Sequence, residues 1–543
     1  MYNDIKNVSE LIQYQANKRP GKEAITQAKK NLFGGYSYPS YSFKAMNDKV
    51  NQFCNKLETL GVKRGHRVLF FIKPNLDFCV ITFALFRMGA TPIFIDPGMK
   101  KEHFFSCIKD VEPDVLIGIP KVHLIRHFYK SVFSNIQIFI TTGRLGFIAN
   151  SIYTKLQNEP ITFNTFIPKE NDLAAILYTS GGTGTPKGVE YGHDIFINQT
   201  KMLQNEFNLT AEDLDIPGFP LFSFFTLAMG MTSCIPDMNP ADPINCDPKK
   251  LYQNISDKNA SFIAGSPAIW ERLADYCLRE NLKLNSVKYV VMFGAPVSVK
   301  IHKKFAKVLP NGTTYTPYGA TECLPIANAS GKFILTNIYK DMLSGMGTCV
   351  GKPLTGVRIK IIKQVEENIS EFQSIEELSP NEIGEILVNS PNVTKGYFKN
   401  ESANKKSKVI DNSGKIWHRM GDVGYFDEHG LLWFCGRKKH VVEAKGKKYY
   451  PAQIESIYNQ HPKIKRSALI YDRKNNSPAL VIERYDQKEV IESMFLMDLK
   501  NLSQTNIHTK AIVEFYARNN FPVDSRHNIK IDRTKLQFDI TGA

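Results

Sequence analysis

The stretch that decides the fold reads Tyr178-Thr179-Ser180-Gly181-Gly182-Thr183-Gly184-Thr185-Pro186-Lys187-Gly188. It follows residues 173–177, a short apolar run typical of a buried strand. Glycines let backbone N–H groups approach an anion closely, hydroxyl side chains add donors, and Lys187 adds a positive charge. The pattern predicts a cradle for a polyphosphate. A flexible surface loop is the alternative, and the density of small and hydroxyl-bearing residues disfavours it.

This loop is not a Walker A sequence, because that pattern requires Ser or Thr directly after the lysine, whereas Gly188 follows Lys187. It resembles the phosphate loop of the adenylate-forming superfamily, which includes acyl-CoA synthetases, luciferases and peptide-synthetase adenylation domains. The resemblance implies that Lys187 is catalytic and that the loop binds the β- and γ-phosphates of ATP. The implied ATP-binding residues of the loop are Thr179, Ser180, Gly181, Gly182, Thr183, Gly184 and Lys187.

The rest of the chain predicts an α/β fold. A chain of 543 residues is too long for one hydrophobic core, so we expect at least two domains. The apolar runs that predict buried strands are residues 68–72, 92–95, 115–117, 138–140, 289–293 and 384–388. Residues 76–88 predict a helix between the first two, and this alternation favours a mainly parallel sheet. The acidic segment 363–381 reads as a surface insertion, and a second, smaller unit begins near Arg437.

Composition narrows the class of partner and compartment. The formal charge of +16 suggests affinity for anions or a basic solvated surface, and no arginine-rich helix or zinc-finger spacing supports a nucleic-acid partner. The nine cysteines form no C-x-x-C unit, which favours reduced thiols and a cytoplasmic location. The N-terminus lacks an apolar signal core. The uncharged stretch 222–236 is too short to span a bilayer and predicts a buried helix lining a pocket, and peripheral contact with the inner face of a membrane stays open.

A second motif, Tyr318-Gly319-Ala320-Thr321-Glu322, lies about 130 residues after the phosphate loop. Glu322 is a hard oxygen ligand suited to Mg²⁺ that bridges phosphates. By itself the pentapeptide is equally typical of a turn with a surface glutamate, but its position matches the superfamily's second nucleotide motif. The resemblance implies that Glu322 holds the metal, that Glu322 and Thr321 are catalytic, and that an adenine-facing turn precedes them. The implied nucleotide-binding residues here are Gly294, Ala295, Pro296, Tyr318, Gly319 and Thr321.

Two further motifs complete the order. Residues 421–425 (GDVGY) continue to Arg437, and the Asp422 carboxylate can accept both ribose hydroxyls while Arg437 donates to the sugar or the α-phosphate. Near the end, Lys530 resembles the superfamily's C-terminal catalytic lysine, although Asn528-Ile529 stands where a simpler turn with a Gly-Lys pair is usual. The resemblance extends from about residue 8 to residue 536.

The resemblance also implies a division of labour between domains. A large adenylation domain (residues 1–436) would be followed by a small mobile α+β domain (residues 437–543) that carries Lys530 and pivots at Lys439. The other basic residues of 437–448 are typical of a solvated hairpin. In the first reaction a carboxylate oxygen attacks the α-phosphorus of ATP and expels pyrophosphate, so cations should dominate catalysis. ATP and Mg²⁺ are the expected cofactors, and CoA joins them only if the second step forms a thioester.

One segment departs from the ordinary ligases. Acyl-CoA synthetases often carry His after Pro-Leu-Phe, and here Ser223 takes that place. This segment, with residues 235–243 and with Arg526, His527 and Asn528, resembles the β-lactone synthetases of bacterial long-chain olefin biosynthesis. The resemblance implies a 2-alkyl-3-hydroxy fatty acid whose own hydroxyl attacks the activated carbonyl, and it implies partner enzymes of that pathway. The expected acyl-pocket residues, each equally able to be plain core, are Phe222, Ser223, Phe224, Phe225, Leu227 and Met229.

Two alternatives remain open at this point. A long-chain acyl-CoA ligase, or an acyl-AMP ligase that loads a carrier protein, would share the first step. A catalytically silent acyl- or nucleotide-binding module is the alternative from another class, and the presence of Lys187, Glu322, Asp422, Arg437 and Lys530 argues against it.

Overall fold

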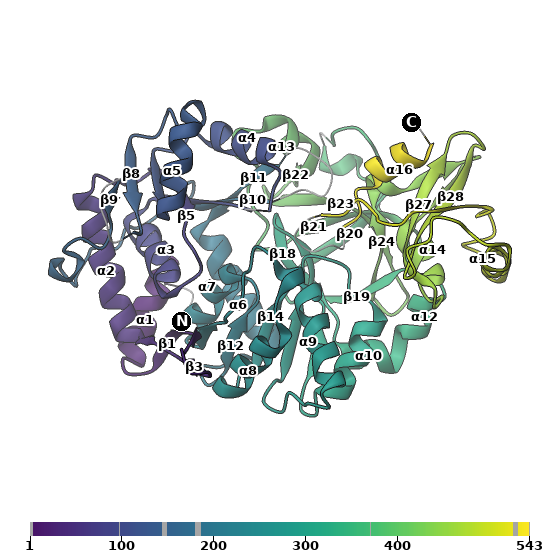
Figure 1. Cartoon of the computed structure of the whole chain (residues 1–543). Helices are drawn as coiled ribbons and strands as arrows, with labels where there is room; N and C mark the ends of the chain where they lie inside the picture. The colour runs from purple at the N-terminus through teal and green to yellow at the C-terminus, as the bar shows by residue number, and fades with distance from the viewer. Residues whose placement is uncertain are drawn as a thin grey trace.

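Three large β-sheets organise the chain, and a small sheet near the C-terminus adds a fourth layer (Figure 1). The computed structural model describes residues 4–96, 98–143, 149–179, 186–369, 371–524 and 530–541. In Figure 1 the C-terminal helix α16 (Arg533–Thr541) lies at the end of the molecule opposite α2 (Phe43–Thr59).

The first seven-stranded sheet has the order β11-β10-β6-β5-β7-β8-β9. Its strands are β5 (Arg67–Phe71), β6 (Thr91–Ile95), β7 (Val115–Gly118), β8 (Ile138–Thr141), β9 (Asn150–Ser151), β10 (Leu173–Thr179) and β11 (Lys187–Gly192). Every neighbouring pair is parallel except β10 and β11. The predicted strands and the mainly parallel pairing are confirmed. Helices α3 (Leu76–Met88), α4 (Lys101–Val111) and α5 (Pro120–Phe128) provide the crossovers that parallel neighbours require.

The second seven-stranded sheet has the order β16-β15-β14-β12-β13-β1-β4 and is parallel up to β1, with β4 antiparallel at its edge. Its strands are β1 (Glu23–Gln27), β4 (Ser40–Ser42), β12 (Leu214–Pro217), β13 (Thr232–Ile235), β14 (Phe262–Gly265), β15 (Tyr289–Met292) and β16 (Thr313–Tyr315). The helices along this part of the chain are α6 (His193–Phe207), α7 (Ser223–Met229), α8 (Pro248–Lys258), α9 (Pro267–Arg279) and α10 (Val299–Val308).

The third sheet is antiparallel throughout and has the order β17-β18-β19-β24-β23-β21-β20, with β22 paired to β23. Its strands are β17 (Tyr318–Ala320), β18 (Cys323–Asn328), β19 (Thr348–Pro353), β20 (Arg358–Ile362), β21 (Gly384–Asn389), β22 (Lys408–Ile410), β23 (Ile416–Phe426) and β24 (Leu432–Arg437). Short helices α11 (Gly331–Phe333), α12 (Tyr339–Leu343) and α13 (Glu401–Ser407) connect them. The segment after β20 is largely exposed, as the predicted insertion requires.

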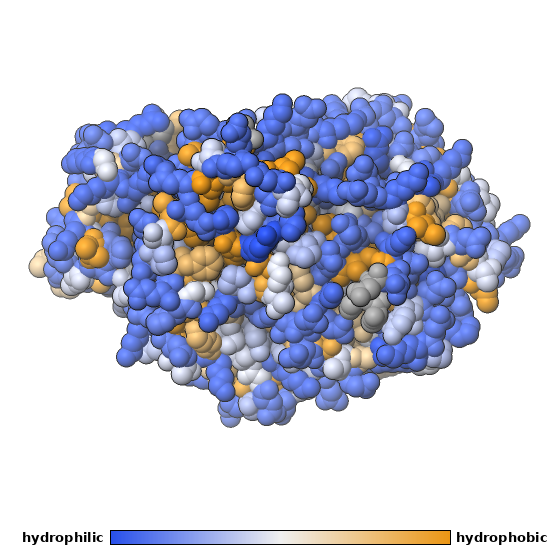
Figure 2. All heavy atoms as spheres, turned by 180° about the vertical axis from the view of Figure 1, so that it is seen from behind, coloured by the Kyte–Doolittle hydropathy of each residue, from blue (hydrophilic) through white to orange (hydrophobic). Residues whose placement is uncertain are grey.

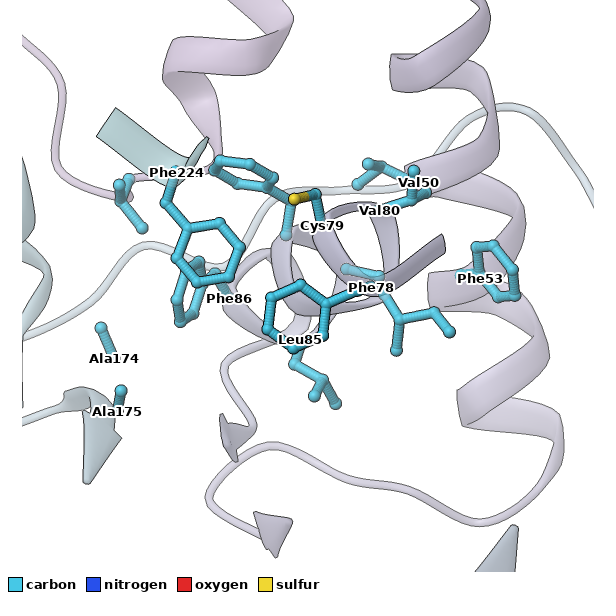
Figure 3. Close-up of a cluster of buried hydrophobic side chains, with 14 of the residues drawn as sticks. Val50, Phe53, Phe78, Cys79, Val80, Leu85, Phe86, Ala174, Ala175 and Phe224 are labelled. Carbon is cyan, nitrogen blue, oxygen red and sulfur yellow. The ribbon is translucent and has the colours of Figure 1, made fainter. Parts of the chain in front are cut away.

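Helix α3 is buried on all sides and shares a core with residues of both seven-stranded sheets (Figure 3). Its first turn is capped by Asn75, whose side chain accepts from the Phe78 backbone N–H at 2.9 Å, and it ends at Gly89 with a φ of 76°. In Figure 3, Phe78 and Phe86 of α3 lie beside Phe224 of α7. A helix that is apolar all round belongs in the interior of a large protein, so α3 holds the two sheets together.

The prediction of one helix over residues 222–236 is wrong in its second half. Helix α7 ends at Met229, where Gly230 takes a φ of 89°, and the chain continues as the buried strand β13. A mostly apolar, uncharged run cannot separate a buried helix from a buried parallel strand, and the glycine that divides them is the local signal.

The C-terminal unit has its own small core. Strands β27 (Ile464–Asp472), β28 (Ser477–Arg484) and β29 (Glu514–Ala517) form its sheet, and α14 (Pro451–Tyr458), α15 (Ser493–Thr505) and α16 complete it. A 3₁₀ turn (Lys438–His440) joins β24 to the hairpin of β25 (Val442–Ala444) and β26 (Lys447–Tyr449). Another two-stranded hairpin, β2 (Lys29–Lys30) with β3 (Tyr36–Ser37), lies near the N-terminus, as does α1 (Glu10–Lys18).

The sequence predicted reduced cysteine thiols and a stretch, residues 222–236, that is too short to span a bilayer. All nine cysteines are buried and none is paired with another in a disulfide. Within the part of the chain that the structure describes, no helix combines the length and apolarity needed to cross a bilayer.

Candidate active site

A large cleft joins motifs that lie far apart in the sequence. Its volume is about 2650 Å³, and residues of all three large sheets and of the C-terminal unit line it. The lining residues include Lys187, Gly294, Ala295, Pro296, Tyr318, Gly319, Thr321, Glu322, Asp422, Arg437, Lys439 and Lys530. Figure 2 shows a mostly hydrophilic face of the molecule with hydrophobic side chains gathered toward its middle. The fold therefore assembles residues of all four motifs around one cavity.

The turn between β17 and β18 presents the second motif to the cleft. The Thr321 carbonyl accepts a 2.6 Å hydrogen bond from the Tyr191 hydroxyl. The Glu322 carbonyl accepts a 2.9 Å hydrogen bond from the Thr394 backbone N–H. These two bonds hold the turn in place, so the Glu322 carboxylate is fixed at the cleft.

Tyr397, which the sequence did not single out, connects the metal candidate to the phosphate loop. Its hydroxyl donates to Glu322 Oε1 at 2.7 Å. The Lys187 ammonium lies over its ring, 4.7 Å from the centroid. A single bridge between Tyr397 and Val189 fixes this segment against β11. Because Tyr397 and Glu322 are 75 residues apart in sequence, no local pattern marks this contact.

Lysine rather than histidine supplies the positive charge near Glu322. Burial lowers the pKa of Lys408 to about 8, and the negative charge of Glu322 opposes that effect. Burial also holds the pKa of His418 well below its usual range, and the charges of Lys408 and Lys187 lower it further. His418 is therefore neutral near pH 7, and its buried Nδ1 has no hydrogen-bond partner among the described residues.

Asp422 lies in the interior of β23, opposite Arg437 of β24. Its Oδ2 accepts a 2.7 Å hydrogen bond from the Tyr318 hydroxyl. Its Oδ1 lies 3.0 Å from Arg437 Nη1 as an ion pair, but it is buried and forms no hydrogen bond within the described residues. Burial raises the pKa of Asp422, and the Arg437 guanidinium opposes the rise. A buried acceptor that lacks a donor fits a ribose hydroxyl.

The phosphate loop connects two antiparallel strands rather than a strand and a helix. Thr179, at the end of β10, pairs with Lys187, at the start of β11. Ser180, Gly181, Gly182, Thr183 and Gly184 lie outside the described residues, as does the side chain of Thr179. The described Lys187 side chain lines the cleft.

The C-terminal motif and the hinge candidate both contribute residues to the lining of the cleft. The Lys530 backbone N–H donates to Asp524 Oδ1 at 2.8 Å, which fixes this end of its loop. Burial and the charge of Arg437 lower the pKa of Lys439, while Asp532, two residues after Lys530, opposes the shift. Arg526, His527 and Asn528 lie outside the described residues.

An apolar arm extends the cleft toward β5, β6, α4 and α7. Its phenylalanines are Phe70, Phe71, Phe78, Phe94, Phe104, Phe105, Phe219, Phe224 and Phe225. Of the residues expected to form an acyl pocket, Phe224 and Phe225 line this arm. The other expected residues, Phe222, Ser223, Leu227 and Met229, do not line the cleft and are at most 7% exposed.

Only some of the expected acyl-pocket residues line the cleft because residues 222–229 present one face to the cleft and another to the core. Phe222 turns into the core, where it stacks on Phe262 and Phe293 with ring centroids 5.7 and 5.6 Å apart. The missed lining residues come from β5, β6 and α4, and only the assembled sheet brings them to α7.

Ser223 belongs to a buried polar cluster beneath α7. The Ser233 hydroxyl donates to Ser223 Oγ at 3.0 Å, and Thr226 Oγ1 donates to Asp215 Oδ2 at 2.9 Å. Burial raises the pKa of Asp215 to about 8. Ser223, the first residue of α7, therefore anchors the start of this helix to buried polar side chains, and its hydroxyl does not line the cleft.

The described residues hold no cluster of three or more His, Cys, Asp and Glu side chains suited to a metal ion. A site built around the single carboxylate of Glu322 suits Mg²⁺, which usually keeps several waters and binds substrate phosphates alongside one or two protein carboxylates. The donor set at the cleft therefore fits a metal that arrives with ATP.

A cleft of this construction, on this fold, defines an AMP-binding enzyme. The chain belongs to that family, whose profile, described as "AMP-binding enzyme", matches residues 12–398. It is accordingly an AMP-forming ligase that uses ATP.

Within this class, the chain is similar to two olefin beta-lactone synthetases in sequence and to a coenzyme A synthetase in fold. The chain is 35% identical to an olefin beta-lactone synthetase of Xanthomonas campestris pv. campestris, over 98% of this chain and 96% of that relative. It is 32% identical to an olefin beta-lactone synthetase of Stenotrophomonas maltophilia, over 98% and 97% of the two chains. Among solved structures, O-succinylbenzoate coenzyme A synthetase (MenE) from Bacillus subtilis in complex with AMP is similar in fold. It has a TM-score of 0.75 at 19% identity and covers 97% of this chain and 98% of its own.

Proposed function

We propose that this enzyme converts a long-chain 2-alkyl-3-hydroxy acid into an acyl-adenylate and then closes it to a β-lactone. One observation carries the proposal: the cleft that holds the nucleotide motifs continues into an arm lined by phenylalanines. An apolar acid and ATP must meet in one cavity for this reaction. The similarity to two olefin beta-lactone synthetases over nearly the whole chain supports the choice of second step.

In the proposed first step, cations offset the repulsion between two anions. The substrate carboxylate oxygen bonds to the α-phosphorus while the bond to the β-phosphate oxygen breaks, which releases pyrophosphate. Lys187 binds the β- and γ-phosphates, and Glu322 would hold Mg²⁺, which would supply further positive charge to the phosphates. Lys530 approaches the carboxylate and the α-phosphate. Tyr397, which also lines the cleft, positions Glu322 through its hydroxyl.

The adenosine half of ATP would lie along the third sheet. Asp422 accepts from the ribose hydroxyls, which gives its buried Oδ1 a donor, and Arg437 donates to the sugar or the α-phosphate. The Tyr318 hydroxyl donates to Asp422, which fixes the side chain and leaves its ring to lie against the adenine. Gly294, Ala295 and Pro296 form the facing turn, and Thr321 donates to the α-phosphate.

In the proposed second step the acceptor is already part of the substrate. The oxygen of the 3-hydroxyl bonds to the activated carbonyl carbon, and the bond from that carbon to the AMP oxygen breaks. The hydroxyl proton leaves to solvent or to the departing phosphate, so the products are the β-lactone and AMP. Tethering replaces a second substrate, and no CoA is consumed.

We further propose that residues 437–543 move as a unit between the two steps. β24 ends at Arg437, and the residues beyond it have a core of their own. Lys439, in the 3₁₀ turn that follows, absorbs the backbone change.

The proposal is tested by incubating the protein with ATP, Mg²⁺ and a long-chain 2-alkyl-3-hydroxy acid, with and without CoA. We expect AMP release at the same rate in both mixtures and a β-lactone detected by mass spectrometry. The matched control acid lacks the 3-hydroxyl: it should support pyrophosphate exchange but give no lactone. Strict dependence on CoA, or on an acyl carrier protein, would instead establish the ligase alternatives. An absence of AMP with every acid tested would favour the silent binding module.

A further inference from the structure

We propose that α5 is a docking surface for an anionic lipid bilayer, placed where the apolar arm of the cleft reaches the outside of the protein. Helix α5 (Pro120–Phe128) lies at the surface near α4 (Figure 1). That the acid enters here rests on the proposed function, whereas the binding to lipid does not.

The apolar stripe of α5 points away from the core. The stripe consists of Leu124, Ile125 and Phe128. The basic Lys121 precedes them on the same helix face, because the four residues follow the spacing i, i+3, i+4 and i+7. All four are exposed, with Leu124 at 51% and Phe128 at 82%. A helix on an ordinary globular surface buries such a stripe, whereas a helix that lies in a lipid interface exposes it.

The opposite face of α5 anchors it to the protein through polar contacts. The buried His123 shares a 2.9 Å hydrogen bond between Nε2 and the Ile140 carbonyl. The Arg126 guanidinium stacks on the Phe139 ring at 3.7 Å. The orientation of α5 is therefore fixed, and its apolar face cannot rotate inward without breaking both contacts.

The chain segment that contains α5 is basic, which is complementary to an anionic surface. From residue 115 to residue 158 the sequence contains no Asp or Glu, while Lys121 and Lys130 lie exposed at the two ends of the helix. The nearest preceding carboxylates, Glu112 and Asp114, are paired with Lys399 and Arg67. Basic residues beside exposed apolar ones are the chemistry that anionic headgroups and acyl chains recognise together.

The stripe is continuous with the apolar arm of the cleft. Pro120, Lys121, Val122 and Ile125 of α5 line the cleft beside Phe104, Phe105 and Phe133. Leu124 and Phe128 do not line it, so the same short helix contributes side chains to the cavity and to the outer surface. An acid with two long alkyl chains partitions into bilayers, and this placement would let it pass from lipid to the cavity without crossing water.

The test is flotation of the full-length protein with vesicles, which requires no turnover. We expect binding to phosphatidylcholine vesicles that contain phosphatidylglycerol, weaker binding to phosphatidylcholine alone, and loss of binding at high salt. Phe128→Ser should weaken binding about tenfold, and Lys130→Gln about fivefold. Pyrophosphate exchange with a short soluble acid, measured without vesicles, should stay unchanged in both variants, which shows that they are folded.

Phe33→Ser is the matched control, since Phe33 is fully exposed on the β2–β3 hairpin and next to basic residues. It should bind vesicles like the unaltered protein. The proposal is overturned by three results: no vesicle binding, equal binding to neutral and anionic vesicles, or loss of binding in Phe33→Ser while Phe128→Ser binds normally. If lactone formation fails but vesicle binding follows α5, the docking surface stands and the proposed reaction falls.

Discussion

Replacing Tyr397 with phenylalanine should raise the Mg²⁺ requirement of adenylation while the fold stays intact. Tyr397→Phe removes the 2.7 Å hydrogen bond to Glu322 but keeps the ring that lies 4.7 Å from Lys187 Nζ. A hydrogen bond to a charged acceptor contributes about 1.5–3 kcal/mol. Residues that orient a metal-binding carboxylate change metal affinity by about 10–100-fold. Both figures predict that half-maximal pyrophosphate exchange needs about 10–100 times more Mg²⁺.

Tyr425→Phe is the matched control for this prediction. The Tyr425 hydroxyl donates to the Met346 carbonyl at 3.0 Å, and its buried side chain does not line the cleft. Tyr425→Phe should lose about 1 kcal/mol of unfolding free energy and Tyr397→Phe about 1.5–3 kcal/mol, but only Tyr397→Phe should shift the Mg²⁺ titration. A wild-type titration for Tyr397→Phe, or an equal shift in Tyr425→Phe, would refute the role of Tyr397 in positioning Glu322.

Three further predictions concern the C-terminal motif, the hinge and a buried carboxyl. Lys530→Ala should slow pyrophosphate exchange ~10²-fold or more, because it removes a cation from the adenylation transition state, while Lys535→Ala on the exposed side of α16 should not. Lys439→Pro should spare pyrophosphate exchange but lower overall turnover, and an equal loss of both rates would contradict a hinge. The pKa of Asp215 is about 8 in the fold against an ordinary 3.8, so the folded state binds the extra proton between these values and stability falls as pH rises through that window. Asp215→Asn should abolish this component, up to about 1.4 kcal/mol per pH unit, in urea unfolding measured from pH 5 to 8; parallel pH profiles would show that Asp215 does not ionise as described.

Local patterns were sufficient for the α/β layers. The helix predicted over 76–88 matches α3, and the predicted strands match β5, β6, β7, β8, β10, β15 and β21 to within two residues at each end. These elements are buried, so their composition reports their environment directly. The family and the order of its motifs could likewise be inferred from short stretches, because each motif is contiguous.

The same reasoning failed where a residue's role depends on which face it presents. Residues 222–236 are uncharged and mostly apolar, yet Phe225 reaches the cleft while Phe222 and Ser223 turn into the core. The change from α7 to β13 inside this stretch is decided by the position of Gly230. An amino-acid string carries no record of the opposing surface, and that surface selects the face.

The sequence by itself predicted the class of chemistry from four motifs in order: a glycine-rich loop proposed to bind phosphates, a glutamate proposed to hold Mg²⁺, an aspartate proposed to bind the ribose, and a late lysine. Tertiary structure alone decided that Tyr397 meets Glu322, that Asp422 Oδ1 is buried without a hydrogen-bond donor among the described residues, and that the Phe-lined arm joins the cleft that holds the proposed nucleotide motifs. It also decided that the apolar stripe of α5 faces outward. The physical reason is common to all of these features. They depend on how segments separated by tens to hundreds of residues pack together, and this packing exists only after the sheets have assembled.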